Sequence, residues 1–291
     1  MIHLIQVVIL GVLLGGVYAL MASGLTLLYG VMQIVNLAHG VFILIGAYVA
    51  FSLFENLAID PLLSVVVTAP MMFLFGVVIY RLLFVRIAGG ERYTEMSVLL
   101  TFALALVLEG VLTFVFTGVF RSVTPLYATS AINLGQLFIP SAQLYASIMS
   151  VVLLVGLWSF LRFTRLGYGI RATMQNRTAA QIVGVDVTRV STVAFGIGIG
   201  LAGASGSMIA FLFSFYPARH WQWIAILLAL IVLGGLGSLK GAIVGAVALA
   251  VAAGLVGDTF GFTWSPMTFF GALFLILLIR PQGLFGKSRV A

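Results

Sequence analysis

Cysteine, charge and histidine are all scarce in this 291-residue chain. Because it has no cysteine, disulfides and thiolate metal sites are excluded. Charged residues make up only 7% of the sequence, whereas a soluble domain carries roughly a quarter. Three histidines and seven carboxylates form no His-Glu-x-x-His pair and no cluster suited to a metal, so we expect neither a metal nor a cofactor in this chain. This composition cannot form a water-soluble surface.

Apolar residues are correspondingly abundant, at 63% of the chain. They recur in runs of about 20 residues, the length of a helix that crosses a bilayer. We therefore expect an all-α, polytopic membrane helical bundle of 8 to 10 transmembrane helices, forming one domain over residues 1–291. The first run follows no positively charged segment, so we expect it to remain as a span rather than to be cleaved as a signal peptide. Charged and proline-containing breaks delimit nine candidate spans, near residues 4–29, 38–54, 62–82, 96–119, 142–162, 191–214, 222–238, 241–257 and 264–280.

The first two spans are separated by a broken segment near residues 23–40, where the polar residues are Gln33, Asn36 and His39. The surrounding apolar run is too long for one helical crossing, so part of it must be a break, a turn or a re-entrant piece. Residues spaced by three share a face if they are helical, and polar groups at membrane depth are tolerated where they line an aqueous path. These three residues are candidates for a translocation path, with capping and interhelical hydrogen bonding as the alternative.

Positive charge lies almost entirely on one set of loops. The opposite loops carry only Arg121 and Arg219 as basic residues. Since Lys and Arg mark cytoplasmic loops, the C-terminus is expected in the cytoplasm, and nine spans would place the N-terminus outside. Although the net charge is +7, the basic residues are isolated, so no nucleic-acid partner is expected. Twelve of the 14 Lys and Arg residues fall in the first set: Arg81, Arg86, Arg92, Arg162, Arg165, Arg171, Arg177, Arg189, Lys240, Arg280, Lys287 and Arg289.

Glu109 is the one carboxylate predicted deep within a span, and intramembrane ionisable residues are functional candidates. It could belong to the translocation path, or it could be a hydrogen-bonded residue that locks helices together. An ion-coupled secondary transporter or channel would use it as a proton or cation site. An intramembrane hydrolase with Ser205 as nucleophile needs a histidine base, and His220 is expected in an external loop just after that span. Close packing explains the glycines around Ser205 better, as it does the pairs Gly11/Gly15, Gly196/Gly200 and Gly241/Gly245.

A polar cytoplasmic loop, at about residues 164–190, is the most distinctive hydrophilic segment. Its central part, residues 171–185, predicts a short amphipathic helix across the membrane face, ended by Gly184.

This loop resembles the coupling loop of ATP-binding-cassette (ABC) importer permeases, whose signature is Glu-Ala-Ala, three residues, then Gly. Thr178, Ala179, Ala180 and Gly184 occupy those positions, with Thr in place of Glu. The residues that the resemblance assigns to coupling are Arg171, Asn176, Arg177, Thr178, Ala179, Ala180, Gln181, Gly184 and Asp186.

Two further segments are similar to the LivH-type permeases of the branched-chain amino acid ABC importer family. They are residues 24–48, which contain the broken segment, and the glycine-rich residues 233–241. The resemblance implies a non-catalytic permease subunit in the bacterial plasma (inner) membrane. Its expected partners are membrane lipid, a second homologous permease, two cytoplasmic ATPases that bind ATP and magnesium, and an extracytoplasmic solute-binding protein. The implied solutes are branched-chain amino acids or related urea, amides or aromatic acids.

Overall fold

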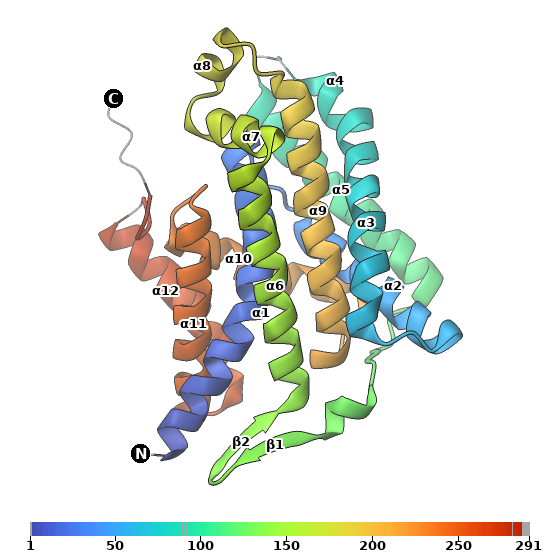
Figure 1. The fold of residues 1–291 in the computed structure, drawn as a ribbon, viewed down its shortest axis with the longest axis vertical. Coiled ribbons are helices and arrows are strands. Elements are labelled where there is room, and N and C mark those ends of the chain that lie inside the picture. The colour runs from blue at the N-terminus through green and yellow to red at the C-terminus, as the bar shows by residue number, and fades with distance from the viewer. Residues whose placement is uncertain (1, 89, 91, 281, 287–291) are drawn as a thin grey trace.

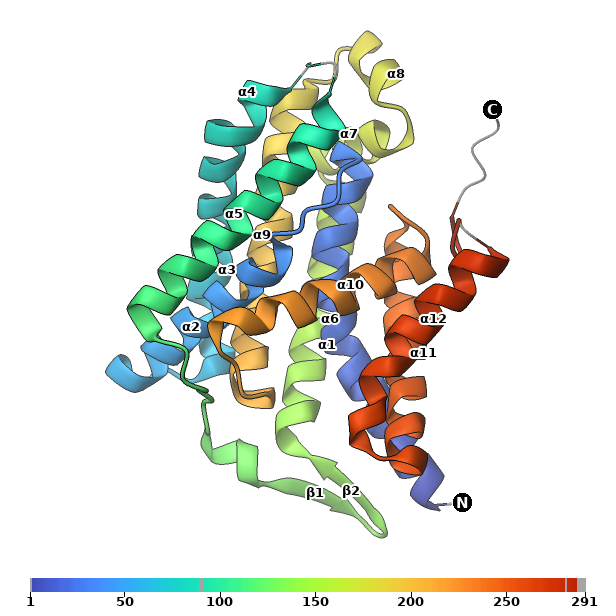
Figure 2. The same cartoon turned by 180° about the vertical axis from the view of Figure 1, so that it is seen from behind.

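The computed structural model describes residues 2–88, 90, 92–280 and 282–286, so Lys287 and Arg289 of the charge pattern lie outside the described residues. Within this part the chain forms a bundle of long helices with a small hairpin at one end (Figures 1 and 2). The elements, in order, are α1 (Ile2–Met32), α2 (His39–Leu57), α3 (Pro61–Ile79), the π-helical η1 (Tyr80–Phe84), α4 (Val85–Ile87), α5 (Tyr93–Phe116), η2 (Leu126–Thr129), β1 (Ala131–Leu134), β2 (Leu137–Pro140), α6 (Ser141–Phe163), α7 (Arg165–Gln175), α8 (Arg177–Ile182), α9 (Val187–Leu212), η3 (Pro217–Arg219), α10 (His220–Gly234), α11 (Leu239–Phe260), η4 (Phe262–Trp264) and α12 (Ser265–Ile279).

Nine helical segments of the described chain are long and apolar enough to cross a membrane, which confirms the predicted span number. The sequence did not predict the antiparallel hairpin of β1 and β2 between the fourth and fifth spans. Gly135 makes its turn with φ +65°, and Tyr127 just before it donates a 3.0 Å hydrogen bond to Asp60 at the start of α3. The hairpin and η2 therefore lie together at one end of the bundle, opposite the end that carries α4, α7 and α8 (Figure 1).

The centre of the bundle is α9, which packs against α1, α2 and α3. Its small residues allow backbones to approach closely, as is common between transmembrane helices. A Cβ atom on Gly206 would collide with the carbonyl oxygen of Ile43, and one on Gly46 with the backbone of Gly203. A Cβ on Gly196 would lie 2.8 Å from Phe73 Cε2. The prediction that these glycines serve packing is confirmed.

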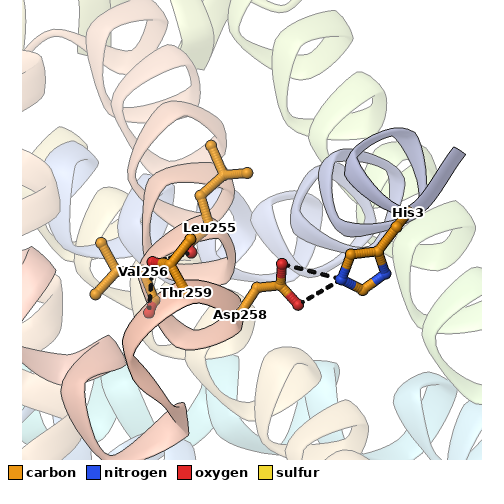
Figure 3. Close-up of polar contacts among 5 residues, drawn as sticks. All are labelled: His3, Leu255, Val256, Asp258 and Thr259. Carbon is orange, nitrogen blue, oxygen red and sulfur yellow. Dashed lines mark hydrogen bonds and ion pairs between the residues drawn. The ribbon is translucent and has the colours of Figure 1, made fainter. Parts of the chain in front are cut away.

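The packing of α1 against α11 follows the same rule in an antiparallel arrangement. Cβ atoms on Gly11 and Gly15 would lie 2.7 Å from the Cα atoms of Val251 and Val247. Where α1 begins and α11 ends, Figure 3 shows the imidazole of His3 directed at the Asp258 carboxylate, with Nε2 at 2.8 and 3.0 Å from its two oxygens. The His3 side chain is largely exposed, so the pair contributes little to stability.

The two ends of the bundle differ in charge. We call one end the α7–α8 pole, because these helices and α4 lie there, and the other the hairpin pole (Figure 1). The described basic residues of the predicted cytoplasmic loops belong to elements that begin or end toward the α7–α8 pole, whereas Arg121 and Arg219 flank the hairpin pole. The charge asymmetry of the sequence is thus an asymmetry between two poles of the fold.

The close contact of α9 with α2 gives a stability prediction. Gly206→Val should lower the apparent melting temperature by several degrees. Overpacking costs about 1–3 kcal/mol, and each kcal/mol of lost stability lowers the melting temperature by roughly 2–4 °C. Gly156→Val on α6 is the control, since no atom lies within 4 Å of a Cβ at that position. Thermal denaturation followed by size-exclusion chromatography in detergent measures both. Equal melting of the two variants would contradict the packing argument.

Candidate functional site

The predicted amphipathic helix over residues 171–185 is in fact two helices. The chain leaves α7 at Asn176, which is extended with φ −156° and ψ 109°. The Asn176 side-chain oxygen accepts a 2.9 Å hydrogen bond from the backbone N–H of Ala179 and so caps the start of α8. The single-helix prediction was wrong because an Asn side chain competes for the backbone at a helix start.

The end of α8 agrees with the sequence. Gly184 has φ +85°, which favours glycine, and its N–H donates to the Gln181 carbonyl at 3.0 Å. Asp186 then accepts a 2.9 Å hydrogen bond from the Arg189 N–H and begins α9. The loop residues from 176 to 186 therefore act as caps that define a short, separately oriented α8.

The exposed surface of α8 is more apolar than its motif suggested. Ala180 is buried, whereas Thr178, Ala179 and Gln181 are exposed. Ile182 and Val183, which the motif did not single out, have exposed fractions of 80% and 76%. Two adjacent apolar residues in an otherwise polar loop are the signal that could have identified them. Of the other predicted coupling residues, Arg171 is exposed and its guanidinium carbon lies 4.8 Å from the centre of the Tyr168 ring, and Arg177 starts α8.

All three sequence segments that carry the resemblance meet at the end of α1. Gly30 in α1 is in direct contact with Met174 of α7, where a Cβ would collide with the methionine methyl group. On the neighbouring side, a Cβ on Gly237 in the glycine-rich connection would lie 3.5 Å from the Gly30 Cα. The Met174 side chain of α7 therefore lies against the last turn of α1, which precedes the break.

The break between α1 and α2 is not helical from residue 33 to 38, so the shared helical face predicted for Gln33, Asn36 and His39 does not exist. Gln33 is exposed, with φ +57°, and ends α1. Asn36 is buried, and its side-chain oxygen accepts from the Ala38 N–H at 3.0 Å. His39 is also buried, with Nε2 3.3 Å from the Met21 carbonyl oxygen. Of these three residues, only Gln33 is exposed in this conformation.

Glu109 has two partners that the sequence did not reveal. Its Oε2 atom lies 3.0 Å from His220 Nε2 and accepts a 3.0 Å hydrogen bond from Trp221 Nε1. His220 is not in a loop, as predicted, but is the fully buried first residue of α10. The prediction was wrong because α10 begins directly after η3, which ends at Arg219, so no loop residue separates the two elements. The cluster joins α5 to α10, which crosses the bundle obliquely (Figure 2).

The predicted path residues gather around one junction of three elements. The His220 carbonyl oxygen is in direct contact with Gly40, next to His39. On α5, the Thr101 hydroxyl accepts from the Leu37 N–H at 3.3 Å, two turns before Glu109. The break and α10 thus both make polar contacts with α5.

Among the described residues, a hydrolase pair of Ser205 and His220 is not formed. The Ser205 hydroxyl donates to the Ala202 carbonyl at 2.8 Å, and His220 is engaged by Glu109. The described chain contains no group of three or more His, Asp or Glu residues that could hold a metal.

Comparison of the sequence with known proteins identifies its family. The family described as the permease component of branched-chain amino acid transport systems matches residues 7–278. The permease protein BraD of Pseudomonas aeruginosa is 28% identical over 99% of this chain and 97% of its own length. The LivH permease of Escherichia coli is 26% identical over the same shares, and the LivM permease of Salmonella typhimurium is 32% identical over 53% of this chain and 37% of its own. The chain belongs to the family of branched-chain amino acid transport permeases.

Proposed function

We propose that this chain is the transmembrane permease subunit of an ABC importer, paired with a second, homologous permease, two cytoplasmic ATPases and an external solute-binding protein. The observation that supports this most directly is the contact of α7 with the last turn of α1 through Met174 and Gly30. It connects an exposed loop helix to the broken segment in the bundle. The partial similarity to LivM supports a homologous second permease.

In this proposal α8 is where the ATPase binds. Ile182 and Val183 provide an exposed apolar contact of the kind that forms the centre of a protein interface. ATP and magnesium are bound by the ATPase, and this chain contributes no catalytic group. When the ATPase moves α8, the close contact of Met174 with Gly30 passes the displacement to α1. The non-helical residues 33–38 allow α1 and α2 to move separately.

The solute proposed for this permease is a branched-chain amino acid, as named for BraD and LivH, or one of the related small polar solutes. The junction of the break with α5 and α10 is the proposed border of the path. Within it, Gln33 is exposed, and the Glu109 side chain has an exposed fraction of 21%. In this proposal Glu109 serves to join α5 to α10, because its carboxylate contacts both His220 and Trp221.

The α7–α8 pole is proposed to face the cytoplasm, with the C-terminus on the same side. The concentration of arginine at this pole and the nine spans support this orientation.

Ile182→Asp should abolish copurification of the ATPases with the permease, because it places a charge in an apolar contact where hot-spot losses are about 2 kcal/mol or more. Leu126→Asp is the control, since Leu126 is 97% exposed but lies on η2 at the hairpin pole. Affinity purification of the co-expressed subunits tests both variants. Retention of the ATPases by the Ile182 variant would refute α8 as their binding site.

Orientation can be tested by cysteine labelling without background, because the natural chain has no cysteine. With a membrane-impermeant maleimide, Leu126→Cys should react in intact cells and Thr178→Cys only in inverted vesicles. Both positions are exposed in the fold, so access depends on the membrane side. The reverse labelling pattern would place the α7–α8 pole outside.

Variants of Glu109 distinguish the ATP-driven importer from an ion-coupled transporter. Glu109→Gln keeps an acceptor for its two donors and should preserve ATP-dependent uptake in proteoliposomes that contain the whole complex. Glu109→Ala leaves both donors unpaired and should lower stability by about 1–3 kcal/mol, measured as a lower melting temperature. An ATP-independent, pH-dependent flux that Glu109→Gln eliminates would favour the ion-coupled transporter instead.

A further inference from the structure

A groove at the α7–α8 pole is lined by neither Ile182 nor Val183, the two residues proposed to contact the ATPase. It lies between the end of α3, with η1 and α4, and the first turns of α9, and its volume is about 640 Å³. We call it the Arg81–Arg189 groove. The residues that line it include Arg81, Val85, Asp186, Thr188, Arg189 and Thr192.

The groove carries an excess of positive charge. Its two guanidinium groups come from different helices, and its carboxylate belongs to Asp186, which accepts a hydrogen bond from the Arg189 backbone N–H. Among the described residues, ion pairs within 4.0 Å are His3 with Asp258 and His220 with Glu109, so neither groove arginine is neutralised by a described carboxylate. The charge of the groove suits a singly charged phosphodiester.

The shape of the groove connects this charge to the apolar side of the bundle. Its floor is closed by close packing, because a Cβ on Gly196, one turn below Thr192, would lie 2.8 Å from Val77 Cγ2. Its rim includes Val85, and below it the exposed residues Leu74, Val78 and Leu82 of α3 and η1 follow at helical spacing. A ligand in the groove would therefore have its anion beside two arginines and its apolar part along α3.

The local backbone at the end of α3 explains why Arg81 faces the groove from its exposed side. The π-helical turn η1 contains Arg81, and π-turns within α-helices are frequent at functional sites. In this turn Tyr80 and Phe84 are buried and pack against Phe195 of α9 in tilted geometry, with ring centroids 5.6 and 5.0 Å away. The aromatic contacts anchor the turn to α9, while Arg81 remains on the exposed side.

We propose that the Arg81–Arg189 groove binds the headgroup of an anionic phospholipid from the adjacent leaflet. Basic pockets between transmembrane helices at a cytoplasmic surface bind such headgroups, and the apolar stripe on α3 distinguishes a lipid from a soluble anion. A lipid in the groove would hold the end of α3 against the first turn of α9, which directly follows the coupling loop. The proposal does not depend on which solute is transported.

Native mass spectrometry of the purified complex in neutral detergent tests this, with phosphatidylglycerol as the probe and phosphatidylcholine as the neutral comparison. Wild type should bind phosphatidylglycerol preferentially. The double variant Arg81→Gln/Arg189→Gln should bind it roughly tenfold more weakly or worse, because each basic residue near a membrane surface contributes to anionic-lipid affinity. Arg81→Lys/Arg189→Lys should retain most of the binding.

Arg86→Gln is the matched control, because Arg86 is exposed on α4 but does not line the groove. It should bind phosphatidylglycerol as wild type does. Melting temperatures verify that the variants are folded, and if the double variant does not fold, each single Gln variant should still show weaker binding. Equal binding of the two lipids, or equal loss in the Arg86 variant, would overturn the proposal.

Two further binding experiments identify what occupies the groove. Inorganic phosphate should not displace phosphatidylglycerol at millimolar concentration, and displacement would assign the groove to a soluble anion. The permease should also bind the lipid equally well with and without its ATPases. Loss of the lipid when the ATPases are added would assign the groove to the protein interface and refute the lipid site.

Discussion

Close approach of helix backbones around α9 is the constraint on which the rest of this structure depends. Inside a bilayer, apolar side chains gain little by leaving lipid for protein, so helices associate through packing and polar contacts. Gly46 against Gly203 and Gly206 against Ile43 bring α2 and α9 into backbone contact, while Gly196 admits Phe73 of α3. This arrangement sets the position of α2, and with it the place where the chain can break between the first two spans. It also closes the floor of the Arg81–Arg189 groove.

A break at membrane depth is stable only if its backbone groups find partners within the protein. Here the Asn36 side chain accepts from Ala38, and the Leu37 N–H donates to Thr101 of α5. The backbone groups of residues 33–38 thus find partners within the segment and on α5 rather than in a continuous helical ladder. The contact of Gly30 with Met174 places α7 directly against the turn that precedes this segment.

The polar groups of the bundle are distributed according to depth. At the α7–α8 pole, arginines serve the proposed orientation, ATPase docking and lipid binding, with apolar Ile182 and Val183 as the exposed contact of α8. At the junction of the break with α5 and α10, Glu109 is bonded to His220 and Trp221. An ionisable group in an apolar environment is costly unless it has such partners.

The sequence by itself determined the number of spans, the one-sided charge, the break between the first two helices and the end of α8 at Gly184. These features depend on local composition: hydrophobic length, isolated arginines and a residue that tolerates positive φ are visible in a single segment. The partners of Glu109, the burial of His39 and the meeting of Gly30 with Met174 and Gly237 were decided only by the tertiary structure. Each joins residues on different helices, and apolar spans of similar composition carry little information about which of their faces meet. The two-helix form of residues 165–182 lies between these cases, because Asn176 is a recognisable cap, but a single sequence does not show that it ends one helix and starts another.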